Sequence, residues 1–186
     1  ELVEAFSLER VVKSGARFNA DKAKWFNKEY LRKKSVSELT DLYIPVLESK
    51  GVTGFSREYV ERVVTLIQER ATFVADFWDI ASYLFVAPKT FVEKDAAKFW
   101  KEENYTLALQ AADFILNFEG EFTKASLEGP LEEYIRGNEW PMGKVMNCLR
   151  LALVGASSGL GIADIVTLIG KKELARRIEY IKSKLC

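Results

Sequence analysis

The chain has 186 residues, with 27 Lys or Arg, 27 Asp or Glu and no His. An apolar fraction of 48% indicates a globular chain, and the length suffices for one core or two small helical ones. The lack of histidine excludes a Ser-His-Asp or Cys-His nucleophile system, a His-liganded catalytic zinc and a histidine general base. Any acid–base chemistry would have to come from carboxylates, Lys, Tyr or Cys. Nothing in the sequence requires it, and we expect no catalytic residue and no metal site.

The zero net charge is a sum over an uneven distribution. Residues 21–34 carry six bases and two acids, residues 171–184 repeat this balance, and residues 93–133 hold ten acids and four bases. One interpretation is that basic ends and an acidic middle select an anionic partner. The other is that charges of both signs coat solvated helix faces.

Cysteine usage and hydropathy bear on the compartment. The two cysteines, Cys148 and Cys186, provide neither a disulfide framework nor a CxxC metal site, which favours a reducing, cytoplasmic location. Charges interrupt every apolar run well before the roughly 20 residues that span a bilayer, so we expect no membrane partner. The first residues, ELVEAFSLERV, lack both a methionine and a signal-peptide pattern, which favours a domain of a longer protein.

The apolar spacing is helical almost throughout, and no stretch alternates with period two. In chain order, Asp21 is expected to start a basic amphipathic helix, and Ser35 with Glu38 forms a capping box for the next. Ser56 is a good N-cap for a third helix, and Thr72 can cap a fourth. These signals predict four helices before residue 85.

Later residues continue the helical pattern. Apolar positions mark helices around residues 107–118, 131–135, 145–152, 162–169 and 174–181, and Gly170 is a natural stop between the last two. The stretch from Phe85 to Phe91 contains Pro88 and precedes the change in charge balance, so it is the expected boundary between two parts. The sequence thus predicts an all-α fold of about nine helices in two consecutive helical-bundle subdomains.

Residues 153–161 read LVGASSGLG, which looks like the cofactor-binding turn of short-chain dehydrogenases. That turn needs a preceding strand and a later strand with an acidic residue, whereas the residues that follow Gly161 here are helical and basic. We therefore interpret Gly155 to Gly161 as a flexible loop between helices, whose backbone N–H groups could still face an anion.

Both ends of the chain carry a family resemblance. The segment FSLERVVKSGARFNADKAKWFNKEYLR is similar to the one after the catalytic domain of bacterial glutamyl-tRNA synthetases. The segment MGKVMNCLRLALVGASSGLGIADIVTLIGKKELARRI is similar to the last helices of that family, and ERATFVADFWDIASYLF matches between them in spacing. The glycine-rich turn falls within the family's own loop.

The resemblance implies the C-terminal anticodon-binding region of a class I glutamate–tRNA ligase, an α-helix cage. Residues 1–34 would be the tail of the region that contacts the tRNA stem, and residues 35–88 and 89–186 the first and second anticodon-binding subdomains. HIGH-like and KMSKS-like signatures are absent from the sequence, so the fragment itself should not aminoacylate. ATP and Mg²⁺ would belong to the parent's catalytic domain, which glutamylates tRNA-Glu; we expect a monomeric parent and no DNA partner.

Five residues match, or replace, anticodon contacts of the family. Arg70 in QERATF matches an arginine that reads an anticodon base and rejects glutamine tRNA, and Arg150 in CLRLAL matches another. A family threonine falls on Gly159, so its contact is lost or passes to Ser157 or Ser158. For a further family arginine, Arg136 is the candidate. The alternative for each arginine is an ordinary solvated surface residue.

Basic side chains that could neighbour phosphates position RNA without reading it. Their alternative role is surface solubility. They are Lys24, Lys28, Arg32, Lys33, Lys34 and Lys144.

Two neighbouring aromatic residues and three tryptophans are not expected to stack on bases. Trp25 and Phe26 point about 100° apart on a helix, which predicts one in the core and the other at the subdomain junction. Trp78, Trp100 and Trp140 are expected in the core. Two functions remain: tRNA anticodon recognition, or a helical interaction module that binds an acidic protein partner.

Overall fold

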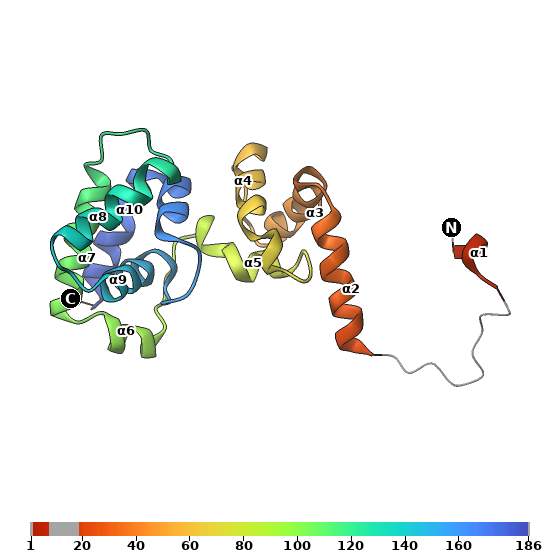
Figure 1. Cartoon of the computed structure of the whole chain (residues 1–186), viewed down its shortest axis with the longest axis horizontal. Helices are drawn as coiled ribbons and strands as arrows, with labels where there is room; N and C mark the ends of the chain where they lie inside the picture. The colour runs from red at the N-terminus through yellow and green to blue at the C-terminus, as the bar shows by residue number, and fades with distance from the viewer. Residues whose placement is uncertain (1, 8–18, 186) are drawn as a thin grey trace.

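The computed structural model of the chain describes residues 2–7 and 19–185. All regular structure in these residues is helical, which confirms the all-α prediction (Figure 1). The α-helices are α1 (Leu2–Ala5), α2 (Ala20–Lys33), α3 (Val36–Ser49), α4 (Arg57–Ile67), α5 (Asp76–Ala81), α6 (Glu93–Phe99), α7 (Glu102–Leu116), α8 (Lys124–Gly137), α9 (Met142–Val154) and α10 (Ile162–Leu185), and the 3₁₀ helices are η2 (Gln68–Arg70) and η3 (Ser82–Leu84).

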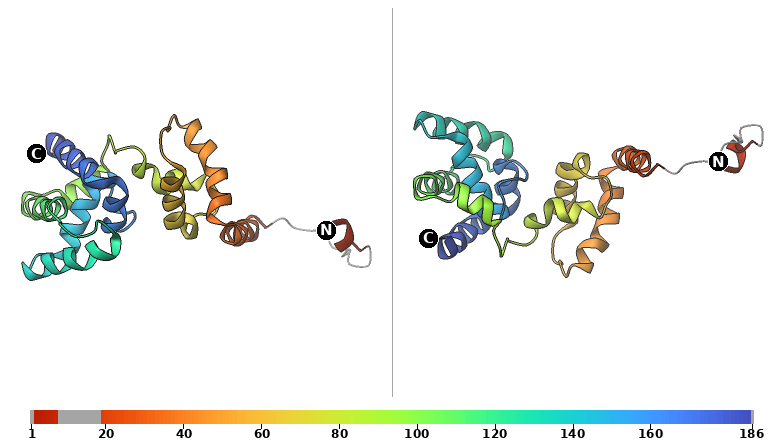
Figure 2. Two further views of the ribbon diagram at one scale, coloured as in Figure 1. Left: turned by 90° about the horizontal axis from the view of Figure 1, so that it is seen from above. Right: turned by 90° about the horizontal axis from the view of Figure 1, so that it is seen from below.

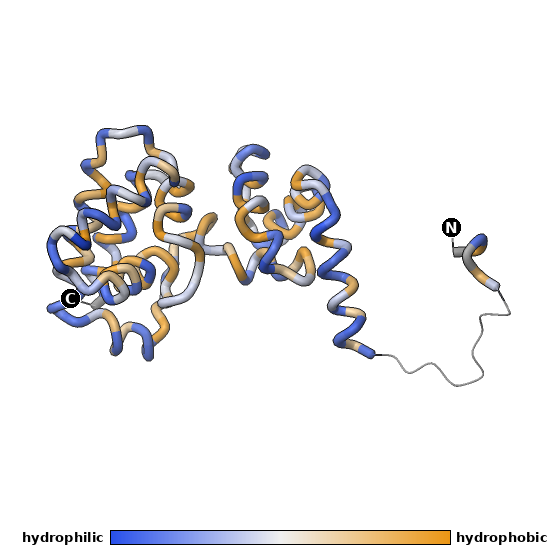
Figure 3. The backbone as a smooth tube through the Cα atoms, in the orientation of Figure 1, coloured by the Kyte–Doolittle hydropathy of each residue, from blue (hydrophilic) through white to orange (hydrophobic). Residues whose placement is uncertain are grey.

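The helices form two groups that follow each other along the chain. Figures 1 and 2 show a first helix group, α2–α5 with η2 and η3, and a second helix group, α6–α10. Residues 85–92 connect the two groups, and α10 of the second contacts η3 of the first. Figure 3 shows apolar and polar residues alternating along the helices, as expected where each helix turns one face to a core. None of the helices in the described residues is long and apolar enough to cross a membrane.

Two predicted helix starts are confirmed in the first group. The Ser35 hydroxyl accepts a hydrogen bond from the Glu38 N–H at 3.2 Å, and the Glu38 carboxylate accepts one from the Ser35 N–H at 2.8 Å. The Ser56 hydroxyl accepts the Tyr59 N–H at 3.2 Å. These bonds satisfy N–H groups that have no partner within their own helices, so α3 and α4 begin where local chemistry alone places them.

The prediction that Thr72 caps a helix is wrong. The N–H groups of Thr72 and Phe73 both donate to the Asp76 carboxylate, at 2.9 and 2.8 Å, and α5 begins only at Asp76. The Thr72 carbonyl meanwhile accepts a hydrogen bond from the side chain of Asn27 on α2. A contact with a distant helix therefore keeps Thr72 in a turn.

Helix α2 also differs from its prediction. Its N-cap is Asn19, whose side-chain oxygen accepts the Lys22 N–H at 3.0 Å, so the helix begins at Ala20, before the expected start at Asp21. Trp25 and Phe26 are 57% and 45% exposed, so the prediction that one of them lies in the core is wrong. Leu31 is the buried residue of α2, which packs against η2, and the two aromatic residues lie outside that face.

Each helix group has a close-packed interior. In the first, the Tyr43 and Phe77 rings meet edge to face with centroids 5.3 Å apart, and both side chains are fully buried. In the second, Leu149 is fully buried on α9, and Cys148 beside it is buried and reduced. Burial of one such large side chain contributes roughly 1.5–3 kcal/mol, so these interiors hold the elements that carry the candidate site.

The segment named α10 consists of two helices separated by a break at Gly170. Gly170 has φ 80° and ψ 163°, a left-handed backbone that other residues rarely adopt, and it interrupts the helix between residues 162–169 and 171–185. The predicted stop at Gly170 is thus confirmed.

Candidate nucleic-acid interface

The loop of residues 155–161 joins α9 to α10 and depends on a glycine at its start. Gly155 has φ 86° and donates its N–H to the Leu151 carbonyl at 2.8 Å, which ends α9. A Cβ at this position would lie 2.7 Å from the Thr90 carbonyl oxygen. The Gly155 carbonyl in turn accepts the Val92 N–H at 2.8 Å. The close approach of the chain before α6 therefore fixes where the loop begins.

The loop is held in place at two further points. The Asp95 carboxylate accepts the Ser157 N–H at 2.7 Å, and the Tyr83 hydroxyl accepts the Leu160 N–H at 3.1 Å. The Ser157 N–H lowers the pKa of Asp95, and burial raises the pKa of Tyr83. Two of the amides that the sequence left free for an anion are thus already used, and the loop is fastened rather than loose.

Two arginines from different helix groups converge on this loop. Arg70, exposed on η2, donates to the Gly159 carbonyl at 3.3 Å. Arg150, half-buried on α9, donates to the Leu160 carbonyl at 3.3 Å and to the Ser157 carbonyl at 3.4 Å. The structure therefore brings together two residues that lie 80 positions apart in the sequence, on successive carbonyls of one loop.

Among the described residues, Arg70 and Arg150 form no ion pair, although the Asp95 and Asp164 carboxylates lie beside the same loop. Desolvation lowers the pKa of Arg150, but a guanidinium stays protonated at neutral pH. Nearby, Lys124 pairs with Asp164 at 3.0 Å; that bond raises the pKa of Lys124, and the charge of Arg70 opposes the rise. The site keeps two unneutralised cations.

The other predicted base-reading residues divide into two sets. Ser157 is half-buried and tied to Asp95, whereas Ser158 is exposed on the same loop. Arg136 lies in the last turn of α8 beside the start of α9, where it pairs with Glu132 at 3.8 Å. Helix α9 is about 20 Å long, so the structure does not bring Arg136 to the loop at its far end.

The predicted phosphate contacts gather mainly on α2. Lys24 and Lys33 are exposed on α2, and Lys28 is half-buried there. Lys144 lies in the first turn of α9 and pairs with Glu103 at 3.7 Å. Arg32 and Lys34 also form ion pairs with glutamates, Arg32 at 3.2 and 2.9 Å and Lys34 at 3.5 Å. One glutamate partner of Arg32 lies on η2, next to Arg70. The basic helix thus adjoins the element that carries the first loop arginine.

Comparison with known proteins decides the family. Residues 21–182 match the family described as "Anticodon binding domain". The chain belongs to this family. Its described residues contain no cluster of three or more His, Cys, Asp or Glu side chains that could hold a metal ion.

Longer relatives extend this match. The anticodon-binding domain is 45% identical to glutamate–tRNA ligases from Flavobacterium psychrophilum and Flavobacterium johnsoniae, over 96% and 100% of its length. It also resembles the crystal structure of a glutamate tRNA ligase from Elizabethkingia meningosepticum in complex with its amino acid, with 34% identity, a TM-score of 0.88 and 97% coverage. The chain spans about a third of these relatives, 35–36% of their length. The resemblance read from the sequence is confirmed.

Sequence reasoning missed the residues that hold the loop of the anticodon-binding domain. Tyr83 and Asp95 act on a loop more than 60 residues away, so no local pattern could have found them. Asn147 is different: its side-chain oxygen accepts from Arg150 at 2.9 Å from one helical turn earlier. An amide three residues before a candidate arginine on a helix is a readable signal, because such residues share a face.

Proposed function

We propose that this anticodon-binding domain reads the anticodon loop of a tRNA at the loop of residues 155–161. The observation that carries the proposal is the convergence of Arg70 and Arg150 on that loop without a carboxylate partner. RNA sequence is read mostly in single-stranded loops, where bases stack on planar groups and hydrogen-bond along their edges. A guanidinium does both, so two arginines on one loop suit base recognition.

The present hydrogen bonds of the arginines favour exchange with RNA. Each arginine donates to backbone carbonyls, which are neutral acceptors held by weaker bonds than a carboxylate would form. A phosphate that replaces one of these carbonyls gives the guanidinium an ionic partner, whereas a base edge replaces one neutral acceptor by another. Ser158 is exposed on the loop between Ser157 and Gly159, whose carbonyls accept from the arginines, so it is available to the same bases. The Ser157 N–H, by contrast, already donates to the Asp95 carboxylate. Arg136 would contribute only if RNA extended along α9.

The basic residues of α2 would position the RNA backbone. Their charges are sequence-independent, so they set affinity and its salt dependence rather than specificity. Lys24, Lys28 and Lys33 are the members of this set without an ion pair among the described contacts.

For the longer protein we propose glutamate–tRNA ligase activity on tRNA-Glu, in the cytoplasm and as a monomer. The support is that the relatives, of which this chain covers about a third, are glutamate–tRNA ligases. ATP and Mg²⁺ would serve the part of such a protein that binds glutamate. The residues of the anticodon-binding domain would contribute recognition and orientation of the tRNA, not chemistry.

A gel mobility shift on this chain tests the proposal. The probes are tRNA-Glu, its three single-base anticodon variants and an unrelated tRNA, at low and moderate salt. We expect tRNA-Glu to bind more tightly than its anticodon variants at moderate salt. Equal affinity for every tRNA would reject base reading, and binding of an acidic protein partner but no tRNA would favour the interaction-module alternative.

Arg70→Gln tests which tRNA is selected. Glutamine keeps hydrogen-bonding capacity but loses the charge and the planar fork. We expect the variant to lose discrimination between tRNA-Glu and tRNA-Gln while retaining most of its binding. Unchanged discrimination would show that Arg70 is a solvated surface arginine.

A further inference from the structure

A cleft opens between the two helix groups, close to where the chain crosses from one to the other. Its volume is about 410 Å³, within the usual range for small-molecule sites. A second hollow of about 310 Å³ shares Val86, Ala87 and two arginines with it and adds Lys89 and others. The loop of residues 155–161 lines neither hollow, so the cleft is separate from the candidate anticodon site.

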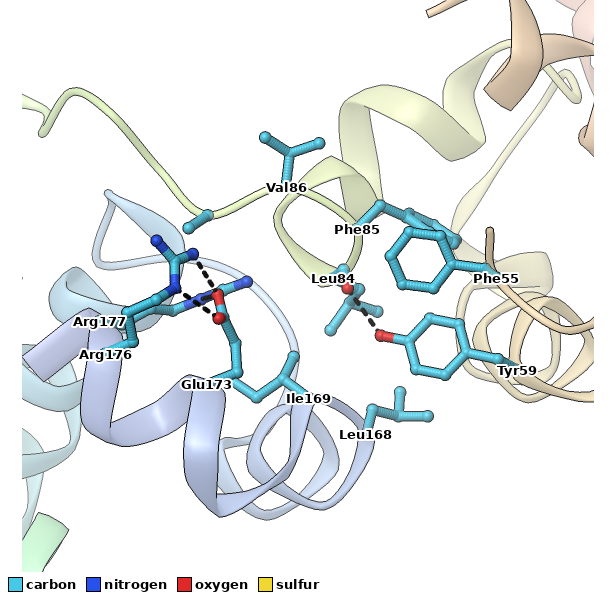
Figure 4. Close-up of a pocket in the computed structure, with 11 residues that line it drawn as sticks. Phe55, Tyr59, Leu84, Phe85, Val86, Leu168, Ile169, Glu173, Arg176 and Arg177 are labelled. Atoms are coloured by element: carbon cyan, nitrogen blue, oxygen red, sulfur yellow. Dashed lines mark hydrogen bonds and ion pairs between the residues drawn. The ribbon is translucent and has the colours of Figure 1, made fainter. Parts of the chain in front are cut away.

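One side of the cleft is an aromatic wall, formed by Phe55, Tyr59 and Phe85 (Figure 4). The Phe55 ring centroid lies 5.0 Å from that of Tyr59 and 5.1 Å from that of Phe85. The Tyr59 hydroxyl donates to the Leu84 carbonyl at 2.6 Å, which fixes the ring, and burial raises its pKa to about 12. Phe55 remains 40% exposed. The wall is rigid yet open to a planar partner.

The other side carries an arginine pair, Arg176 and Arg177, on the second part of α10 (Figure 4). Both guanidinium groups donate to the Glu173 carboxylate: Arg176 through two bonds of 2.7 Å and Arg177 through its Nε at 2.8 Å. Arg176 is 62% exposed, whereas the Arg177 side chain is only 3% exposed.

Arg177 has a donor that the fold does not use. Its Nη1 donates to the Leu153 carbonyl at 2.6 Å, and its Nε is held by Glu173. Its Nη2 has no acceptor among the described residues and is accessible from the cleft that the side chain lines. Desolvation lowers the pKa of this guanidinium. A charged donor that faces the cleft without a protein acceptor can take its acceptor from a bound ligand.

The charge and the shape of the cleft indicate which class of ligand it would bind. Two arginines and one glutamate leave the cleft with a net charge of +1, which matches a phosphodiester group. Rings of the aromatic wall match a planar nucleobase, because stacking tolerates any base. An acidic peptide would satisfy the arginine pair but leaves the exposed Phe55 ring of the aromatic wall unexplained unless it also carries an aromatic residue.

We propose that this cleft binds one unpaired nucleotide of an RNA strand, with the base against the aromatic wall and the phosphate on the arginine pair. It rests on the proposed function for the source of the nucleotide, which is the bound tRNA. The site would be a second point of RNA contact, separate from the loop that reads the anticodon.

Methyl groups in the cleft provide a direct test. The chain is labelled at Ile, Leu and Val methyls and titrated, by NMR, with AMP, a uridine pentamer and inorganic phosphate. We expect saturable shifts of Ile169, Leu168 and Val86 with AMP and with the pentamer, while Ile135 on α8 stays unchanged. Cleft methyls that respond to neither nucleotide would overturn the proposal.

Two variants measure the two halves of the site. Phe55→Ala should weaken pentamer binding by roughly tenfold, the scale of losing one stacked base. Arg176→Gln should weaken it by roughly threefold and reduce the slope of log K against log salt by about 0.7. Lys50→Gln, an exposed lysine at the end of α3, is the matched charge control and should leave affinity unchanged. Arg177 is left intact because it also supports the Leu153 carbonyl.

The outcomes separate this site from the proposed function. If tRNA-Glu binds with anticodon specificity and both cleft variants bind it like the unaltered chain, the proposal of a nucleotide site in the cleft is wrong and anticodon recognition stands. If AMP and the pentamer shift the cleft methyls but no tRNA is discriminated, the cleft stands and the proposed function fails. Shifts with phosphate alone would assign the cleft to another anion and overturn the proposal of a nucleotide site. A Glu-Phe dipeptide is titrated as a further probe, and shifts with it but not with AMP would overturn the proposal in favour of an acidic peptide.

Discussion

The cations beside the loop of residues 155–161 and those of α2 are held in different ways. Arg70 and Arg150 donate to neutral carbonyls and are not paired with carboxylates among the described residues. At the end of α2, by contrast, Arg32 and the C-cap residue Lys34 form ion pairs with glutamates, whereas Lys24, Lys28 and Lys33 have no ion pair among the described contacts. A paired cation presents less net charge to a ligand, and its pair must be broken or shared on binding. The loop arginines therefore differ from the α2 cations in being held in place by backbone carbonyls, and the α2 cations differ among themselves in whether a glutamate neutralises them.

The largest effect is expected at the loop. Arg150→Gln removes a half-buried guanidinium that contacts two loop carbonyls and stands ready for a base edge. We expect the affinity for tRNA-Glu to fall by roughly 10- to 100-fold, about 1.4–2.8 kcal/mol. Filter binding measures this, with Arg136→Gln as the comparator because that exposed arginine lies at the other end of α9. Equal losses of tRNA affinity in both variants would show that the surface that reads RNA extends along α9 and that the loop arginine has no special role.

The support of the loop comes next. Tyr83→Phe deletes the acceptor of the buried Leu160 N–H and leaves that donor unsatisfied. We expect the free energy of unfolding to fall by about 1–2 kcal/mol and Tm by roughly 2–8 °C. Tyr30→Phe removes the same hydroxyl from an exposed ring on α2 and should change neither. Thermal denaturation of both variants measures the difference, and an unchanged Tm for Tyr83→Phe would mean that the loop does not depend on this bond.

Local signals in the sequence predicted the helices but not the way distant parts meet. The capping box at Ser35 and the stop at Gly170 follow from residues within one turn, and both are observed. Thr72 fails as a cap because a side chain from α2 holds it, and the exposure of Trp25 depends on which face of α2 meets η2. These outcomes were set by tertiary contacts, which single-helix patterns do not contain.

The candidate site shows the same limit. The resemblance named Arg70 and Arg150 individually, while their convergence on one loop is a property of the packing of two helix groups. Arg136 was named by the same reasoning and lies elsewhere. Tyr83, which holds the loop, has no local sequence signal at all. Residue types could thus be predicted from sequence, but their assembly could not.

A pH dependence follows from Asp95. The Ser157 N–H lowers the pKa of this carboxylate below its ordinary value of 3.8, so ionised Asp95 stabilises the fold. For a lowered pKa, the contribution is complete above the unfolded-state value and is lost as the pH falls through the folded-state value. We expect Asp95→Asn to reduce stability above about pH 5, and the difference from the unaltered chain to shrink below the ordinary value of 3.8. Asp79→Asn, at an exposed aspartate on α5, is the control, and denaturant unfolding across pH is the measurement. A gap that stays constant to low pH would show that the carboxylate charge is irrelevant.

The smallest effects are expected on α2, and they test the contrast most directly. Lys24→Gln removes an exposed charge that has no ion pair among the described residues, so every tRNA should bind roughly two- to threefold more weakly, with a shallower salt dependence. Lys34→Gln removes a charge that lies 3.5 Å from a glutamate oxygen, and because that charge is already partly neutralised its loss should change affinity less. Neither variant should alter discrimination among anticodons, since phosphate contacts carry no base information. Binding isotherms at two salt concentrations with cognate and anticodon-variant tRNA separate these cases. Equal losses for Lys24→Gln and Lys34→Gln would mean that ion pairing does not determine which cations RNA uses, and the distinction between the loop and α2 would then rest on position alone.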